Sequence, residues 1–146
     1  MRLKVQSLRD GAIVPQYQTK GAAGADLSAC LGEPVTLEPG KRSIIPTGIA
    51  LEIPEGYEVQ IRARSGLAAK HGIGTANGVG TIDSDYRGEI NVILINWSEE
   101  PFEVTNGMRI AQMVIAKYEQ VTLEIVDELS KTERGENKFG STGTHD

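Results

Sequence analysis

Short aliphatic runs, each ended by glycine or proline, constrain the fold of this chain more than any other feature. Runs of about four to eight β-branched residues between such breaks are typical of strands. Pro39-Gly40 is a turn signal of this kind, because proline presets φ and glycine accepts a positive φ. Many short strands at this spacing predict an all-β barrel or sandwich. The expected strands are Arg2–Ser7, Ser43–Ile53, Glu58–Ala63, Glu89–Asn96, Phe102–Val104, Arg109–Ala116 and Gln120–Ile125.

The residues of one segment, Ser65–His71, are typical of a short helix. Ser65 is a suitable N-cap residue, and Gly72 and Gly74 limit the helix to a turn or two. After about residue 130, polar residues and glycine replace the aliphatic ones, which predicts a flexible tail. We therefore expect one domain over residues 1–130 and a flexible C-terminal segment over residues 131–146.

Charge and cysteine content restrict the partners and the compartment. The net charge of −5 disfavours nucleic acid as a partner, but it is compatible with a nucleotide held by a local Arg cluster. No apolar run approaches the ~18 residues that cross a bilayer, and Met1–Ser7 has no signal core. Cys30 is the one cysteine and cannot form an internal disulfide, which favours a cytoplasmic protein and a packed thiol rather than a nucleophile.

Two expected strand segments, Ile90–Ile95 and Met108–Ile115, are almost continuously apolar. A small all-β domain has limited interior for strands that are buried on both faces. The excess of apolar surface favours an obligate oligomer, and a well-filled core of a single chain is the alternative.

Two segments in the first half of the chain carry candidate anion or cation ligands. Arg64-Ser65-Gly66 combines a guanidinium, a hydroxyl and the start of a helix, which together favour phosphate oxygens. The alternative for this segment is an ordinary capped helix. Asp26 in Ala23–Ala29 has the plainer interpretation of a turn residue at the entry to a strand.

The glycine-rich segment Gly74–Gly88 contains two aspartates, Asp83 and Asp85, that would share one face of an extended strand. Paired carboxylates can supply a general base or bind a hard cation. The spacing does not match a calcium loop. A glycine-rich hairpin with solvated aspartates is the alternative interpretation.

Two further segments contain candidate ligand-binding residues. Gln112 interrupts an apolar strand and needs a polar partner, which is either a buried neighbour or a ligand. The tail Arg134–Gly143 places one Arg, one Phe and a Ser-Thr pair among glycines. Its composition is that of a disordered tail, but Phe139 and the polar groups would also suit a lid over a nucleotide.

Together and in this order, the five segments resemble the signature motifs of the trimeric dUTPase family, over about Ala23 to Gly143. The resemblance implies a jelly-roll-like β-barrel in an obligate homotrimer, with active sites shared between chains. It implies Mg²⁺-assisted hydrolysis of dUTP to dUMP and pyrophosphate, the activity of a dUTP diphosphatase. Such an activity limits uracil incorporation into DNA and supplies dUMP for thymidylate synthesis. No nucleic acid or membrane partner is implied.

The resemblance also assigns roles to single residues. Asp83 matches the base that activates the attacking water, and Asp26 the carboxylate that holds Mg²⁺ through water. Tyr86 matches the ring that packs under deoxyribose and excludes a 2′-hydroxyl. The phosphate contacts are implied at Arg64, Ser65, Gly66 and Gln112. The uracil-reading hairpin is implied at Asn77, Gly80 and Ile82. The lid contacts are implied at Arg134, Phe139, Gly140, Ser141 and Thr142, with Phe139 over the uracil and Arg134 at the γ-phosphate.

One departure from the family pattern is Asn137-Lys138, which replaces glycines before the Phe and stiffens the tail. Two rival functions remain. The related dCTP deaminases use a Glu where this chain has Ile93, which leaves no group to activate water at the base. A non-catalytic nucleotide-binding trimer is the other rival, and it would not require Asp83.

Overall fold

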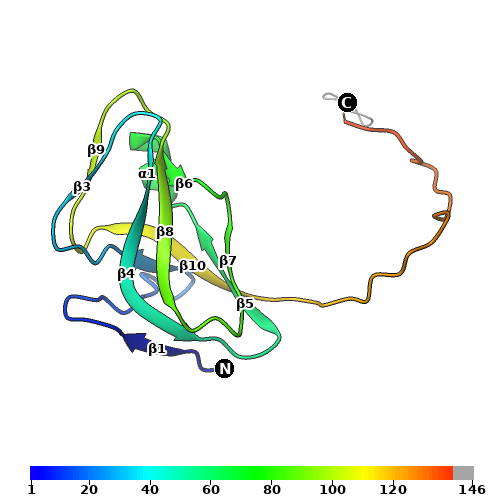
Figure 1. The fold of residues 1–146 in the computed structure, drawn as a ribbon, viewed down its shortest axis with the longest axis horizontal. Helices are drawn as coiled ribbons and strands as arrows, with labels where there is room; N and C mark the ends of the chain where they lie inside the picture. Colours follow the sequence, from blue (N-terminus) through cyan, green and yellow to red (C-terminus); the bar gives the residue numbers. More distant parts are fainter. Residues whose placement is uncertain (140–146) are drawn as a thin grey trace.

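The computed structural model describes residues 1–139, which form ten strands, one short helix and a long exposed C-terminal segment (Figure 1). The strands are β1 (Lys4–Ser7), β2 (Ala25–Ser28), β3 (Val35–Leu37), β4 (Arg42–Glu52), β5 (Tyr57–Arg62), β6 (Ile73–Thr75), β7 (Gly80–Ile82), β8 (Glu89–Asn96), β9 (Phe102–Val104) and β10 (Arg109–Lys117), and the helix is α1 (Ser65–His71).

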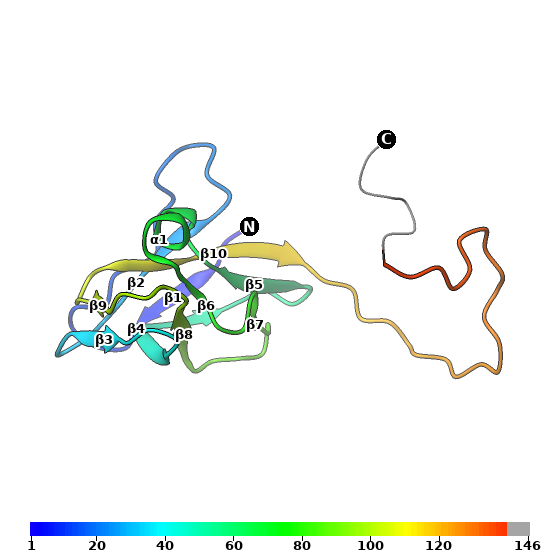
Figure 2. The same ribbon diagram turned by 90° about the horizontal axis from the view of Figure 1, so that it is seen from above.

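The strands pair into three antiparallel sheets. One sheet has the order β1-β4-β8-β6, the second has the order β2-β10-β5-β7, and β3 pairs with β9. The two four-stranded sheets lie against each other, with α1 at one end of the body (Figures 1 and 2). The expected all-β fold is confirmed, but the pairing among residues 1–139 gives three sheets rather than one closed barrel.

The core lies between the two larger sheets. It is built from aliphatic side chains such as Ile45 and Ile49 on β4, Val59 on β5 and Leu94 on β8, each fully buried. Along β8 buried residues alternate with more exposed ones, as expected for a strand with one face on the core. Cys30 is buried as well, in agreement with the packed thiol predicted from the sequence.

The aliphatic runs between glycine and proline breaks predicted the long strands well. β8 and β9 have the expected bounds, and β10 ends one residue later than predicted. β4 and β5 are each shifted by one residue at both ends, and β1 begins two residues later than predicted. The short strands β2, β3, β6 and β7 were not predicted, because each exists through pairing with a strand distant in the sequence rather than through a long aliphatic run of its own. The turn predicted around Asp26 is wrong, since this residue lies within β2.

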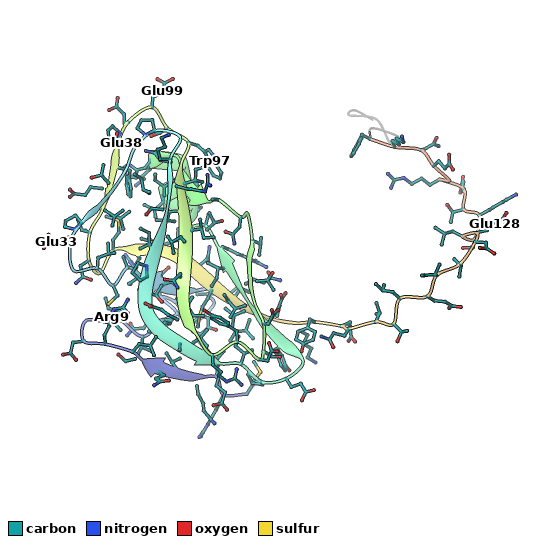
Figure 3. All side chains as sticks on the ribbon, viewed as in Figure 1. Arg9, Glu33, Glu38, Trp97, Glu99 and Glu128 are labelled. Atoms are coloured by element: carbon teal, nitrogen blue, oxygen red, sulfur yellow. The ribbon has the colours of Figure 1, made fainter. Side chains whose placement is uncertain are left out.

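The strand predicted over Gln120–Ile125 is also wrong. No strand is assigned there, and Val121, Leu123 and Ile125 are all exposed. Figure 3 shows the segment after Tyr118 leaving the body, with side chains such as that of Glu128 pointing away from it. The alternation of apolar residues in this segment therefore has no sheet to pack against within the described part of the chain.

Helix α1 has the predicted bounds but a different N-terminus. Arg64 occupies the N-cap position with extended backbone angles, and no side chain caps the helix, so the capping role expected for Ser65 is wrong. The helix ends at Gly72, whose φ of 64° is the left-handed conformation that favours glycine. Over residues 1–139 no helix is long and apolar enough to cross a membrane.

Candidate active site

The carboxylate of Asp26 is held between two arginines. Its Oδ1 lies 3.1 Å from Nε of Arg64, and its Oδ2 lies 3.2 Å from Nη1 of Arg109. The Asp26 side chain is only 12% exposed, whereas those of Arg64 and Arg109 are 29% and 49% exposed. Both guanidinium groups therefore have N–H donors at the surface beside a nearly buried carboxylate.

The sheet brings these residues together from distant parts of the sequence. β10 lies between β2 and β5, so that Gln112 is opposite Asp26 on one side and Arg62 on the other. Arg64 follows two residues after Arg62, and its Nη1 donates to the carbonyl of Arg109 at 3.0 Å. Asp26, Arg64, Arg109 and Gln112 form one polar cluster, which we call the Asp26 group.

The Gln112 side-chain amide finds part of its hydrogen bonding within the chain. Its Nε2 donates to the carbonyl of Ala63 at 3.1 Å, which ties β10 to the segment leading into α1. A Cβ placed on Gly24 would overlap Oε1 of Gln112 and would lie 3.0 Å from its amide carbon. Glycine at position 24 therefore leaves the space that the Gln112 side chain fills.

Ser65 and Gly66 lie in the first turn of α1, and both are exposed. The structure thus brings all four residues of the predicted phosphate site, Arg64, Ser65, Gly66 and Gln112, to the neighbourhood of Asp26. The sequence prediction assigned no role to Arg109. The signal for it was its place in the same motif segment as Gln112, three residues before it.

The predicted uracil-reading hairpin corresponds to the turn that joins β6 to β7, two strands that pair in different sheets, and this turn carries a second set of predicted residues. Gly78 has a φ of 69° and donates its N–H to the carbonyl of Thr75 at 3.0 Å, which closes a tight turn. Asn77 is exposed at this turn, and Gly80 is buried against Ile61. Asn77, Gly80, Ile82, Asp83 and Tyr86, all predicted from the sequence, form what we call the hairpin group.

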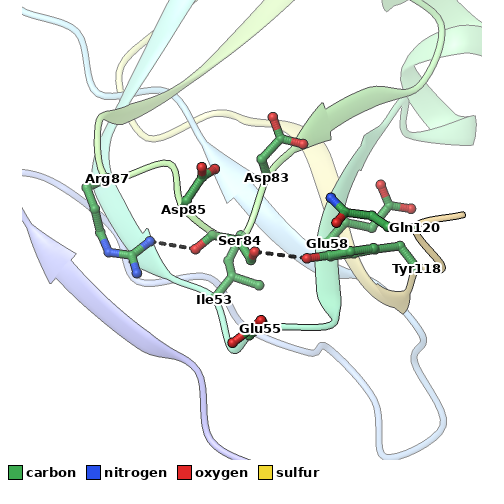
Figure 4. Close-up of a pocket in the computed structure, with 9 residues that line it drawn as sticks. All are labelled: Ile53, Glu55, Glu58, Asp83, Ser84, Asp85, Arg87, Tyr118 and Gln120. Carbon is green, nitrogen blue, oxygen red and sulfur yellow. Dashed lines mark hydrogen bonds between the residues drawn. The ribbon is translucent and has the colours of Figure 1, made fainter. Parts of the chain in front are cut away.

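Asp83 is exposed immediately after β7 and borders two depressions. The larger, of about 670 Å³, is acidic and includes Glu55, Glu58 and Asp85 (Figure 4). Its floor is held by a hydrogen bond of 3.2 Å between the hydroxyls of Ser84 and Tyr118. An aspartate that is accessible to water at the rim of a depression can accept a proton from it.

The smaller depression, of about 260 Å³, contains Tyr86 on one side and Asp83 on the other. We call it the Tyr86 depression; its border is formed by Thr81, Ile82, Asp83, Tyr86, Glu89 and Asn91. The Tyr86 ring is 44% exposed, and its hydroxyl donates to the backbone carbonyl of Glu89 at 3.0 Å. A half-exposed aromatic ring fixed at its polar tip offers an apolar face to a ligand.

The Asp26–Arg109 pair and the hairpin group border different depressions. A third depression, bordered by Asp26 and Arg109, contains no residue of the hairpin group. Neither depression at Asp83 contains a residue of the Asp26 group. Among the depressions described over residues 1–139, the candidate base therefore borders different ones from Asp26 and Arg109.

The tail residues lie apart from both groups. Phe139 is fully exposed, and Arg134 is exposed with its Nε 3.4 Å from the carbonyl of Asn137. The predicted lid contacts Gly140, Ser141 and Thr142 lie outside the described residues.

No group of three or more His, Cys, Asp or Glu side chains in residues 1–139 has the arrangement of a metal site. Asp26 contributes a single carboxylate, and each of its oxygens already faces an arginine. A cation held directly by several protein ligands does not fit this arrangement. A Mg²⁺ ion that keeps its waters and binds phosphate oxygens does fit it.

The fold and these two groups define a β-sheet protein with a cluster of exposed cationic donors that is suited to a polyphosphate. The family model described as dUTPase matches residues 10–143. A deoxyuridine 5'-triphosphate nucleotidohydrolase of Beijerinckia indica is 60% identical over 136 residues, which cover 92% of this chain and 85% of that protein. The enzyme of the same name from Orientia tsutsugamushi strain Boryong is 50% identical over 98% of this chain and 99% of that protein. The chain belongs to the dUTPase family.

Solved structures agree with this assignment. A mutant dUTPase of Staphylococcus bacteriophage 80alpha with dUpNHpp matches with a TM-score of 0.89 and 30% identity, over 98% of this chain and 99% of that one. A mutant dUTPase from phage phi11 of S. aureus, described as coordinating a structural Mg(II) ion, matches with a TM-score of 0.79 and 27% identity. That match covers 88% of this chain and 98% of the phage protein.

Proposed function

We propose that this protein is a dUTP diphosphatase, which hydrolyses dUTP to dUMP and pyrophosphate. The observation that carries the proposal is the Asp26 group, with Arg64, Arg109 and Gln112 around one carboxylate in a chain of the dUTPase family. The relatives that match over most of the chain are named for this activity.

The phosphate chain of the substrate would lie on the Asp26 group. The Arg64 guanidinium offers donors to two phosphate oxygens at once, and the exposed Ser65 hydroxyl and Gly66 amide stand beside it in the first turn of α1. Gln112 would contact the α-phosphate. Arg109 is a further cation at this site and would share the negative charge.

Asp83 would act as the general base. Its carboxylate accepts a proton from a water molecule as that water attacks the α-phosphorus. A new P–O bond forms to the water oxygen, the bond from the α-phosphorus to the bridging oxygen breaks, and pyrophosphate leaves with that oxygen. The exposure of Asp83 at the rim of two depressions supports this role, because it leaves the carboxylate accessible to water.

The hairpin group would select the base and the sugar. Asn77 and the backbone from Gly80 to Ile82 would pair with the edge of uracil, and the tight turn would leave no room for a 5-methyl group. Tyr86 would pack under deoxyribose and exclude a 2′-hydroxyl.

The separation of the two groups supports a homotrimer with shared sites. Because Asp26 and Arg109 border a different depression from Asp83 and Tyr86, a complete site would use the hairpin group of a second chain. A third chain would contribute its tail, the exposed segment after Tyr118. Arg134 and Phe139 of that tail would reach the nucleotide. Gly140, Ser141 and Thr142 would add lid contacts in the same tail.

Mg²⁺ is the proposed cofactor, held by Asp26 through water and by the phosphate oxygens of the substrate. When bound, the ion would neutralise phosphate charge and orient the α-phosphate for attack. Asp26 would also keep the Arg64 and Arg109 side chains extended toward the same region, as it does in the structure.

Pyrophosphate release from dUTP, dTTP, dCTP and UTP, with and without Mg²⁺, tests the proposed function. We expect turnover of dUTP alone, with strong dependence on Mg²⁺. Deamination of dCTP would instead support the related deaminases, although the aliphatic Ile93 offers no group to activate water there. Binding of dUTP without turnover would support a nucleotide-binding protein without catalysis.

A further inference from the structure

The orientation of the Tyr86 ring depends on the backbone of Glu89. The Tyr86 hydroxyl donates to the Glu89 carbonyl at 3.0 Å, so the ring is folded back over the residues between them. A Cβ at Gly88 would lie 2.6 Å from Cζ of Tyr86, which only the absence of a side chain at position 88 permits. Asn91 donates to the same carbonyl at 3.2 Å. The ring position is thus set by where β8 begins.

The start of β8 is in turn held by an irregularity in β4. Pro46 is opposite Asn91 while Ala50 is opposite Glu89, so β4 has two extra residues between these pairs. Within them, the N–H of Gly48 donates to Oε1 of Glu89 at 2.8 Å. Gly48 has a φ of 71°, and a Cβ there would lie 2.9 Å from Sγ of Cys30, so the bulge requires glycine.

Arg9, in the N-terminal segment, binds the carboxylate of Glu89. Its Nη2 and Nη1 lie 2.5 Å and 3.2 Å from the two carboxylate oxygens of Glu89, a bidentate pair. The N–H of Leu8 donates to the carbonyl of Gly48 at 2.8 Å, which fixes the segment that carries Arg9. The hydrogen bonds from Arg9 lower the pKa of the Glu89 carboxyl below its usual value, and partial burial opposes this shift. Figure 3 shows Arg9 on the loop after β1, beside the body of the protein.

We infer that Arg9 and Glu89 are positioning residues for Tyr86, and that through this ring they set the discrimination between deoxyribose and ribose nucleotides. The inference rests on the proposed function, which places the sugar against Tyr86. Glu89 also borders the Tyr86 depression, so a shift of its backbone changes the wall of that depression directly.

The physical reason is that the ring must be rigid to reject one additional hydroxyl. A ring that can rotate away admits the 2′-hydroxyl at low cost, whereas one fixed at its tip does not. Loss of the Arg9–Glu89 pair leaves the Glu89 side chain held by the Gly48 N–H alone. The Glu89 carbonyl, which accepts the hydrogen bond from Tyr86, then becomes more mobile. The Tyr86 ring becomes more mobile as a result.

The test compares kcat and KM for dUTP and UTP in Arg9→Ala, Glu89→Gln and Tyr86→Phe. Each variant is expected to reduce the ratio of kcat/KM for dUTP to that for UTP by roughly two- to tenfold, the range that loss of one hydrogen bond produces. The lower ratio should come mainly from a lower KM for UTP. Arg9→Lys keeps a charge but not the bidentate geometry and should give an intermediate ratio.

A double-mutant cycle separates positioning from general stability. Adding Arg9→Ala to Tyr86→Phe should lower the ratio no further, because the hydroxyl through which Arg9 acts is already absent. Additive effects would overturn the inference. Lys4→Ala is the matched control, because it breaks an ion pair of 2.8 Å between β1 and β4 that has no contact with Glu89. It should leave the ratio unchanged, and an equal loss of selectivity in Lys4→Ala would also overturn the inference.

Tyr86→Ala distinguishes failure of the inference from failure of the proposed function. If Tyr86→Ala lowers the ratio but Arg9→Ala and Glu89→Gln do not, the positioning role is wrong and the role of Tyr86 stands. If Tyr86→Ala leaves the ratio unchanged, both the role of Tyr86 and the positioning role are wrong. Hydrolysis of dUTP itself is judged separately, by pyrophosphate release from the unmodified protein.

Discussion

The side chain of Gln112 occupies the space that any side chain at position 24 would need. This contact joins two of the predicted segments, because residue 24 precedes β2 and Gln112 lies in the middle of β10. Gln112 also donates to the carbonyl of Ala63, next to Arg64. One glycine without a functional group of its own therefore affects the position of a proposed phosphate ligand.

Gly24→Ala should displace Gln112 from the Ala63 carbonyl, because the added Cβ would lie 3.0 Å from the Gln112 amide carbon. We expect a destabilisation of about 1–3 kcal/mol and a raised KM for dUTP. Urea unfolding and steady-state kinetics measure the two effects. Gly32→Ala is the matched control, since a Cβ there meets nothing within 4 Å. Equal behaviour of the two variants would show that the contact at Gly24 has no consequence.

Asp83→Asn should abolish general-base catalysis while leaving the nucleotide site intact, because the amide keeps the shape of the carboxylate but cannot take the proton. We expect the activation barrier to rise by at least ~2–4 kcal/mol with little change in binding. Pyrophosphate release and titration with a non-hydrolysable dUTP analogue measure the two quantities. Glu55→Gln, at the border of the same acidic depression, is the control and should turn over normally. Near-normal turnover of Asp83→Asn would rule out the proposed base.

At the level of elements, the junction between β4 and β8 is the point where the N-terminal segment, the bulge and the segment that carries Tyr86 meet. Thr47 donates its hydroxyl to the carbonyl of Ile90 at 2.6 Å, beside the contacts of Gly48 and Arg9 with Glu89. These bonds satisfy polar groups that the irregular pairing would otherwise leave without partners. The junction therefore combines an irregular backbone with a charged side chain that is 23% exposed.

The Glu89 carboxyl should make the stability of this junction depend on pH. Its pKa is lowered in the folded protein, from a usual value of 4.5, mainly by hydrogen bonds from Arg9. The pair therefore stabilises the fold fully above about pH 4.5 and loses its contribution as the pH falls through the lowered pKa. Urea unfolding at a fixed chain concentration should show Arg9→Ala less stable than the unmodified protein at pH 7. The difference should shrink as the pH falls below 4.5, through the lowered pKa of the Glu89 carboxyl. A difference that stays undiminished down to the acid unfolding of the protein would contradict this assignment.

Across the whole molecule, the compact body ends near Tyr118 and the described remainder of the chain, to Phe139, is exposed. Val121, Leu123 and Ile125 alternate along this segment without covering. Apolar side chains spaced by two residues are suited to an extended segment lying on another surface. This fits the proposed homotrimer, in which the tail of one chain serves the site of another.

Removal of residues 134–146 should abolish most turnover and leave the assembly intact, because the proposed lid would be lost and the preceding segment kept. We expect light scattering to give a mass of three chains for both proteins, with 15.7 kDa per chain for the full protein and a correspondingly smaller mass per chain for the shortened one. Full activity of the shortened protein would rule out a lid.

Phe139→Ala tests the proposed aromatic cover of the uracil within the intact tail. We expect a higher KM for dUTP, because the apolar face that covers the base is lost. Lys138→Ala, at the neighbouring residue, is the control that keeps the ring. Unchanged kinetic constants in Phe139→Ala would show that the ring does not cover the base.

The sequence alone determined the all-β class, the long strands, the bounds of α1 and the family, through the five ordered motifs. These features depend on aliphatic runs, on glycine and proline, and on residue types at fixed spacing, all of which can be recognised along the chain. The short strands β2 and β7 could not be predicted from the sequence, because their existence depends on pairing with β10 and β5.

Only the tertiary structure decided which residues meet. The pairing of β2 with β10 brings Arg109 to Asp26, although 83 positions separate them, and the bulge in β4 brings Arg9 to Glu89 across 80 positions. The alternating segment Gln120–Ile125 shows the same limit, because its pattern is that of a strand but no strand pairs with it in the described chain. Local pattern specifies which face of a strand is apolar, whereas long-range pairing specifies what that face and its polar neighbours contact.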